Sequence, residues 1–177
     1  MADAPRQEEE TRPVAVLAVY TWDMLLAILG IFQALAPIGG GIVNARGQTV
    51  EIPLPLQIVL ALSAASGAAT MIIVASLLTR RRRWVRRLQM ATMGVSIGLA
   101  AISLIVDALI GAGVPLVSVL IAVLVMLINL LAIVLMTERR VVSWYNEAGR
   151  APQYMTGTLG FWALSGCVAI ALLAALR

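Results

Sequence analysis

The chain has 177 residues, of which 61% are hydrophobic and only 12% are charged. Soluble domains are about half apolar and about a quarter charged, so this composition is typical of a protein that folds in lipid. All thirteen basic residues are Arg, and the chain contains one Cys and no His. These counts exclude histidine-ligated haem or zinc, a Ser-His-Asp triad, a lysine Schiff base, four-cysteine iron–sulfur clusters and an internal disulfide. We expect neither a cofactor nor a metal site.

The N-terminal segment, residues 1–13, is polar and acidic over its first dozen residues. Such a segment cannot bury apolar surface, so we expect it to be disordered. It lacks the basic start and the small-residue cleavage site of a signal peptide, and the first apolar stretch is therefore expected to remain as an anchor. Residues 14–177 are expected to form a single helical bundle.

Five apolar stretches each reach the roughly 20 residues that a helix needs to cross a bilayer. They lie at about 14–38, 54–79, 88–110, 115–137 and 156–176. The segment 42–52 alternates weakly around a Gly and predicts a short hairpin. The predicted fold is therefore an all-α, polytopic integral membrane protein with five transmembrane helices. Four helices are the fallback, because the Gly- and Ala-rich fifth stretch is the weakest.

The arginines predict an orientation. Six of them form a cluster in one short loop: Arg80, Arg81, Arg82, Arg83, Arg86 and Arg87. Five spans place eleven Arg on the face of this loop, and only Arg46 and Arg177 on the other. Because cytoplasmic loops carry the excess of Arg, we predict a multi-pass protein of a bacterial inner membrane, with the N-terminus in the cytoplasm and the C-terminus outside.

The arginine cluster has two interpretations. It is foremost a topology determinant, and alternatively it binds anionic lipid headgroups at the cytoplasmic face. Nucleic-acid binding is not expected, because the chain has no second basic surface and no reading module. We also expect the aromatic residues near this face to lie at the membrane–water boundary, namely Trp84, Trp144, Tyr145 and Tyr154.

Ionisable and amide side chains inside the spans are the candidate site residues, because they are costly in lipid. Asp23 lies about 14 Å and Asn129 about 12 Å from the cytoplasmic side, at similar depth. Asp107 lies about 28 Å from that side, near the outer boundary. In one interpretation Asp23 is structural, and is either protonated or hydrogen-bonded to Asn129, Tyr20 or a serine of the second span. In the other it binds a proton or a cation.

Two known kinds of membrane protein use intramembrane carboxylates and can be compared with this chain. A carboxylate in the first helix, here Asp23, resembles the small multidrug-resistance transporters, although the other residues of their motif are not found. An intramembrane aspartic protease needs two carboxylates within a few ångströms. The predicted depths of Asp23 and Asp107 differ by about 14 Å, so we do not expect an enzyme.

Small residues mark the faces through which membrane helices approach one another closely. Gly30 shares a face with Asp23 in the first span, and Gly67 lies in the small-residue run of the second. The third span contains a Gly-xxx-Gly pair, Gly94 and Gly98. We expect this pair to pack against another helix of the chain or, alternatively, against a partner protein.

Residues 60–145 carry a further resemblance. A small-residue span runs into an Arg/Trp loop (79–87), and a tight helical hairpin follows that ends in the charged segment 136–142. This pattern resembles uncharacterised small polytopic membrane proteins of GC-rich bacteria, and it implies no activity.

The predicted function is a non-catalytic accessory or structural subunit of a larger membrane complex, with an electron-transfer complex as one candidate. The alternative is a small proton- or cation-coupled transporter that uses Asp23. The expected partners are the lipid bilayer and either membrane proteins or further copies of the chain.

Overall fold

The computed structural model describes residues 12–36, 42–45, 48–110 and 115–176. Five long helices dominate it: α1 (Val14–Leu35), α2 (Leu54–Leu77), α3 (Arg83–Leu109), α4 (Leu116–Thr137) and α6 (Gln153–Leu176). All five are long and apolar enough to cross a membrane. The structure thus confirms five helices of this kind and not the fallback of four. The segment 1–11, Arg46 and Arg177 lie outside the described residues.

Prolines start three of the long helices. Pro13, Pro53 and Pro115 are the residues directly before α1, α2 and α4. Each proline offers its carbonyl to the first turn, as Leu56 N donates to Pro53 O at 2.9 Å. A proline fits this position because the first backbone N–H groups of a helix have no partner within the helix.

Two helices begin earlier than the hydrophobic pattern predicts. The start of α3 is Arg83 and not residue 88, and the start of α6 is Gln153 and not residue 156. The predicted bounds are those of the apolar spans, and the helices extend beyond them because Arg and Gln are themselves good helix formers. Arg83, Arg86 and Arg87 consequently belong to the first two turns of α3 and not to a loop.

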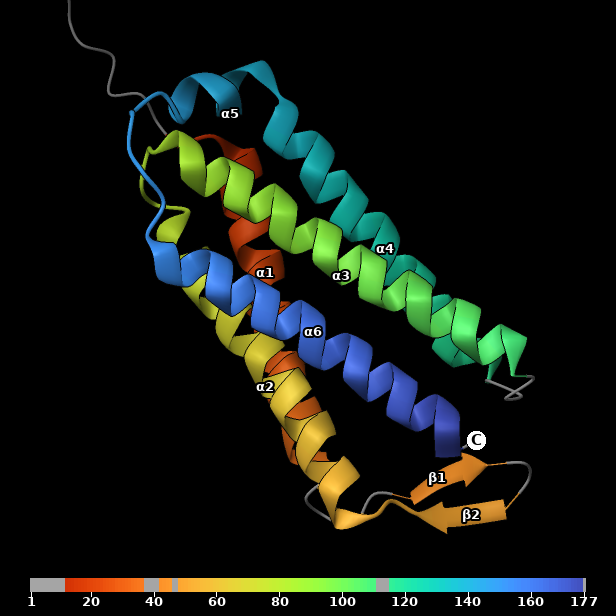
Figure 1. Cartoon of the computed structure of the whole chain (residues 1–177). Coiled ribbons are helices and arrows are strands. Elements are labelled where there is room, and N and C mark those ends of the chain that lie inside the picture. Colours follow the sequence, from red (N-terminus) through yellow and green to blue (C-terminus); the bar gives the residue numbers. More distant parts are fainter. Residues whose placement is uncertain (1–11, 37–41, 46–47, 111–114, 177) are drawn as a thin grey trace, which may run out of the picture.

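The helices form two groups (Figure 1). Helix α2 packs against both α1 and α6, and α3 packs along α4 as an antiparallel hairpin. Contacts of α3 with α6 and of α1 with α4 join the two groups. At one end of the bundle lies the short helix α5 (Arg139–Trp144), and at the other end lies a β-hairpin.

The hairpin consists of β1 (Ile42–Ala45) and β2 (Gln48–Glu51). The strands are antiparallel, with Ile42 opposite Glu51 and Ala45 opposite Gln48. This confirms the hairpin predicted in 42–52. Figure 1 shows it beside the C-terminal end of α6.

The aromatic residues at the α5 end are mostly buried inside the protein. Trp84, Trp144 and Tyr145 are at most 8% exposed, and only Tyr154 is open, at 62%. Three of the four residues predicted at the membrane–water boundary are thus enclosed by the protein itself. The reason is that the segment after α5 folds back over the helix ends, where Arg83 N donates to Glu147 O and Glu147 N donates to Arg81 O.

Candidate functional site: a buried polar cluster

Asp23 lies at the centre of the buried face of α1. The buried residues Val16, Val19, Asp23 and Ala27 follow one another at steps of three and four, the spacing of one helix face. Asp23 itself is fully buried. The structure therefore places this carboxyl among the helices and away from the outer surface of the bundle.

The partner of Asp23 is Gln89 on α3. Gln89 Nε2 donates a hydrogen bond of 3.0 Å to Asp23 Oδ1, and the Gln89 side chain is also fully buried. The other two oxygens of the pair, Asp23 Oδ2 and Gln89 Oε1, are buried and have no hydrogen-bond partner among the described residues. The pair thus has one hydrogen bond and two acceptors without a donor.

A second hydrogen-bonded set lies beside the pair and links three helices. Trp22 Nε1 on α1 donates to Asn129 Oδ1 on α4 at 2.7 Å. Asn129 Nδ2 in turn donates to Ser96 Oγ on α3 at 2.9 Å. Asn129 is fully buried, so these bonds satisfy an amide that would be costly to leave unpaired.

The structure brings Asp23 and Asn129 into neighbouring sets without a hydrogen bond between them. The bond of Asp23 goes to Gln89, and not to Asn129, Tyr20 or a serine of α2 as predicted. Asn129 is engaged by the indole next to Asp23 in the sequence. Tyr20 is half-buried and packs against the hydrophobic core.

Gln89 and Trp22 were missed from the sequence. The signal for Gln89 was present, because it precedes Ser96 by seven residues, or about two helical turns, and so shares its face. It was overlooked because the predicted span began at 88, beside the arginines. Nothing in the local sequence marks Trp22 as a hydrogen-bond donor to another helix.

Asp107 does not belong to this cluster. It follows Gln89 by eighteen residues on the same helix, which separates the two by about 27 Å along α3. Asp23 and Asp107 therefore do not form a carboxylate dyad. No group of three or more His, Cys, Asp or Glu that could hold a metal ion occurs within the part of the chain described.

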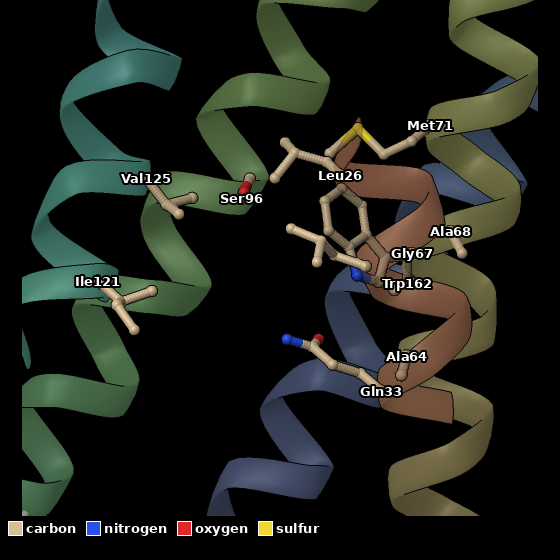
Figure 2. Close-up of a pocket in the computed structure, with 12 residues that line it drawn as sticks. Leu26, Gln33, Ala64, Gly67, Ala68, Met71, Ser96, Ile121, Val125 and Trp162 are labelled. Atoms are coloured by element: carbon tan, nitrogen blue, oxygen red, sulfur yellow. The ribbon is translucent and has the colours of Figure 1, made fainter. Parts of the chain in front are cut away.

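A cavity of about 240 Å³ lies between the two helix groups. Figure 2 shows Ser96, Ile121 and Val125 on the α3–α4 side and Leu26 and Trp162 on the opposite side. Its lining is mainly apolar, with Gln33 and Ser96 as polar members. Ser96 connects this cavity to the polar cluster, because its hydroxyl also accepts the hydrogen bond from Asn129.

The arginine cluster holds the segment around α5 in place. Arg83 Nε donates to Asn146 O at 3.1 Å, and Arg86 Nη1 donates to Met136 O at 3.2 Å. The guanidinium of Arg81 stacks over the ring of Trp144, 3.9 Å from its centre. Arg80, Arg82 and Arg87 are exposed. Part of the cluster is therefore structural, which neither predicted interpretation included.

The four predicted packing glycines divide into two pairs. A Cβ at Gly30 would lie 3.0 Å from Ala68 Cβ, and one at Gly67 would lie 2.6 Å from Trp162 Nε1. These two glycines therefore stand at close helix contacts. At Gly94 and Gly98, a Cβ would meet no described atom within 4 Å.

Comparisons of the chain with protein-family models, with curated proteins and with solved structures find no match. Three features of the molecule itself consequently bear on its function. These are the Asp23–Gln89 pair, the cavity beside Ser96, and the uncovered Gly94–Gly98 face of α3.

Proposed function

We propose that the protein is a non-catalytic integral membrane protein and an accessory subunit of a larger membrane assembly. The observation that carries this proposal is the uncovered face of α3. Gly94 is exposed, and a Cβ added at Gly94 or at Gly98 would meet no described atom of another helix within 4 Å. In lipid, small residues favour the close approach of another helix, whereas lipid-facing positions gain nothing from glycine.

The neighbouring helix α6 supports the same proposal. Gly157 and Gly160 are exposed, and a Cβ at either would meet no described atom within 4 Å. Helix α6 contacts α3 elsewhere, where Gly166 lies against the Leu99 side chain. Two adjoining helices therefore have glycines that no described helix covers, and a transmembrane helix of a partner protein is the proposed occupant on α3.

The proposed location is the inner membrane of a bacterium, with α5 at the cytoplasmic face. The five long apolar helices support a multi-pass protein. The excess of Arg at the α5 end supports a cytoplasmic N-terminus and an outer C-terminus. The same arginines, Arg80, Arg82 and Arg87 among them, are exposed where they would meet anionic headgroups.

Purification from native membranes in a mild detergent tests the subunit proposal. The wild-type protein should migrate with a larger complex, and the double variant Gly94→Leu/Gly98→Leu should migrate alone. The matched control is Ala65→Leu/Ala69→Leu on α2, which makes the same small-to-large change at two exposed positions four residues apart. The control should stay in the complex.

Two results would contradict the proposal. One is a wild-type protein that runs at the mass of a single chain, and the other is a glycine double variant that still migrates with the complex. Mass spectrometry of the complex identifies its members. A complex that contains only this chain would replace the accessory subunit by a homo-oligomer.

The second candidate is a small proton- or cation-coupled transporter that uses Asp23. It is favoured by the position of the cavity, which Ser96 links to the polar cluster around the buried carboxyl. Proteoliposomes with a pH-sensitive dye inside and an imposed Na⁺ gradient test this candidate. Proton movement should occur with the wild-type protein and be lost in Asp23→Asn, and its absence in the wild-type protein would reject sodium–proton exchange.

A further inference from the structure

We propose that Asp23 and Gln89 together form a proton-binding site, in which a proton on Asp23 Oδ2 is donated to Gln89 Oε1. This proton site does not depend on the partner surface of α3. The coupled-transporter candidate, in contrast, requires the proton site. Two oxygens of the pair have no hydrogen-bond donor among the described residues.

The pair lacks one donor hydrogen between its two unpaired oxygens. Gln89 Nε2 already donates to Asp23 Oδ1 at 3.0 Å, which sets the carboxyl and the amide against each other. Asp23 Oδ2 and Gln89 Oε1 are both buried acceptors without a partner in the described structure. A carboxylic acid O–H would donate from the first to the second, so that the acid and the amide exchange two hydrogen bonds.

The helices around the pair provide no cationic side chain that could take the place of this proton. Helices α2, α4 and α6 contain no Asp, Glu, Lys or Arg. The charged residues of α3 are Asp107, far along the helix, and three arginines in its first two turns. Of these arginines, Arg83 and Arg86 donate to backbone carbonyls of the α5 segment.

Tyr145 and Arg12 belong to the α5 end, and Tyr145 interacts electrostatically with both Arg12 and Asp23. Arg12 is exposed. The Tyr145 hydroxyl is itself engaged, because it donates to Leu78 O at 2.9 Å. The Tyr145 hydroxyl thus does not supply the missing hydrogen.

A proton suits this site better than a metal ion. Calcium takes six to eight oxygen ligands, and magnesium takes about six. The described pair has only two oxygens that lack a partner, and both are fully enclosed. A single hydrogen between them satisfies both, which explains why a carboxyl is kept in an apolar face of α1.

Infrared difference spectroscopy on the full chain in lipid nanodiscs tests the site directly. The wild-type protein should show the C=O stretching band of a protonated carboxylic acid, which disappears when the pH is raised. The variant Asp23→Asn should lack this band, and the control Asp107→Asn should retain it. A wild-type spectrum without the band at every pH would overturn the proposal.

The pH dependence of thermal stability is the second readout. The wild-type protein should lose stability as the pH rises, because its folded state holds a proton that the unfolded state releases. The stability of Asp23→Asn should not fall as the pH rises, because the Asn amide can donate to Gln89 Oε1 as the acid does. Asp23→Leu should be less stable throughout.

The Asn and Leu variants separate the proposal from its rivals. If Asp23→Asn were as unstable as Asp23→Leu, the carboxyl would not act as a hydrogen-bond donor and the proposal would fail. If added Na⁺ at constant pH stabilised the wild-type protein and not Asp23→Asn, the site would bind a cation and not a proton. Neither result depends on whether Gly94→Leu/Gly98→Leu leaves the complex.

Discussion

Gly67 and Gly94 have the same side chain but opposite surroundings. A Cβ at Gly67 would lie 2.6 Å from Trp162 Nε1, whereas one at Gly94 would meet no described atom within 4 Å. Trp162 is a large, rigid ring that is only 9% exposed. Because a Gly67 Cβ would meet three atoms of this ring, the ring would have to move as a whole.

Gly67→Ala should therefore lower the free energy of unfolding by about 1 to 3 kcal/mol, the usual cost of overpacking. Unfolding in a denaturing detergent, followed by Trp fluorescence, measures the change. Gly94→Ala is the control and should be neutral or slightly stabilising in the isolated chain, because Ala is a better helix former. Equal losses in the two variants would show that Trp162 does not pack on Gly67.

Tyr145 gives a prediction at alkaline pH. Burial raises the pKa of its phenol well above the usual range. The folded state thus keeps the phenolic proton at a pH where the unfolded state loses it. Stability is unaffected below a pH of about 10, which is the pKa of a Tyr phenol in the unfolded chain, and should fall as the pH rises above it.

Tyr145→Phe should remove this alkaline loss of stability, since it has no phenolic proton. At neutral pH the same variant should be less stable by about 1 kcal/mol, because it loses the hydrogen bond from Tyr145 to Leu78 O. Thermal unfolding between neutral pH and the alkaline limit measures both effects. A variant with the same alkaline slope as the wild-type protein would assign that slope to other groups.

At the scale of elements, the α5 segment depends on the first turns of α3. Arg83 and Arg86 donate to Asn146 O and Met136 O, and these bonds tie residues 136–146 to the bundle. Arg83→Ala/Arg86→Ala should loosen this segment, with a loss of about 1 kcal/mol for each hydrogen bond. Limited proteolysis should cut near residue 147 several times faster in the double variant.

Arg87→Ala is the matched control for this prediction. Arg87 is exposed on the same helix, and Arg87→Ala removes one positive charge, as each single change at Arg83 or Arg86 does. If Arg87→Ala accelerated proteolysis as much as either single change at Arg83 or Arg86, net charge and not the two hydrogen bonds would hold the segment.

The long helices and the hairpin could be predicted from the sequence, because apolar length and turn residues are local signals. The contacts between elements could not. Gln89 lies 66 residues from Asp23, and Trp22 lies 107 residues from Asn129. Asp23 and Asn129 were both candidates, but nothing local specifies which polar side chain of another helix each one meets. Burial of the α5 segment was missed for the same reason.

At the scale of the whole molecule, the two ends of the bundle differ in chemistry. Figure 1 shows α5 at one end and the hairpin at the other. The α5 end contains the six-arginine cluster, while the described hairpin residues contain no Arg. This difference is what the orientation proposal depends on, and it makes the orientation measurable from two single positions.

The chain offers a simple labelling experiment, because Cys167 is its only cysteine. In a Cys167→Ser background, Ser143→Cys places one thiol on α5 and Glu51→Cys places one on β2, both at exposed positions. In spheroplasts, a membrane-impermeant maleimide should label Glu51→Cys at once and Ser143→Cys only after lysis, because the arginine-rich end should face the cytoplasm. The Cys167→Ser parent controls for background labelling. The reverse pattern would invert the orientation, and labelling of both positions before lysis would show that the two ends do not lie on opposite sides of a membrane.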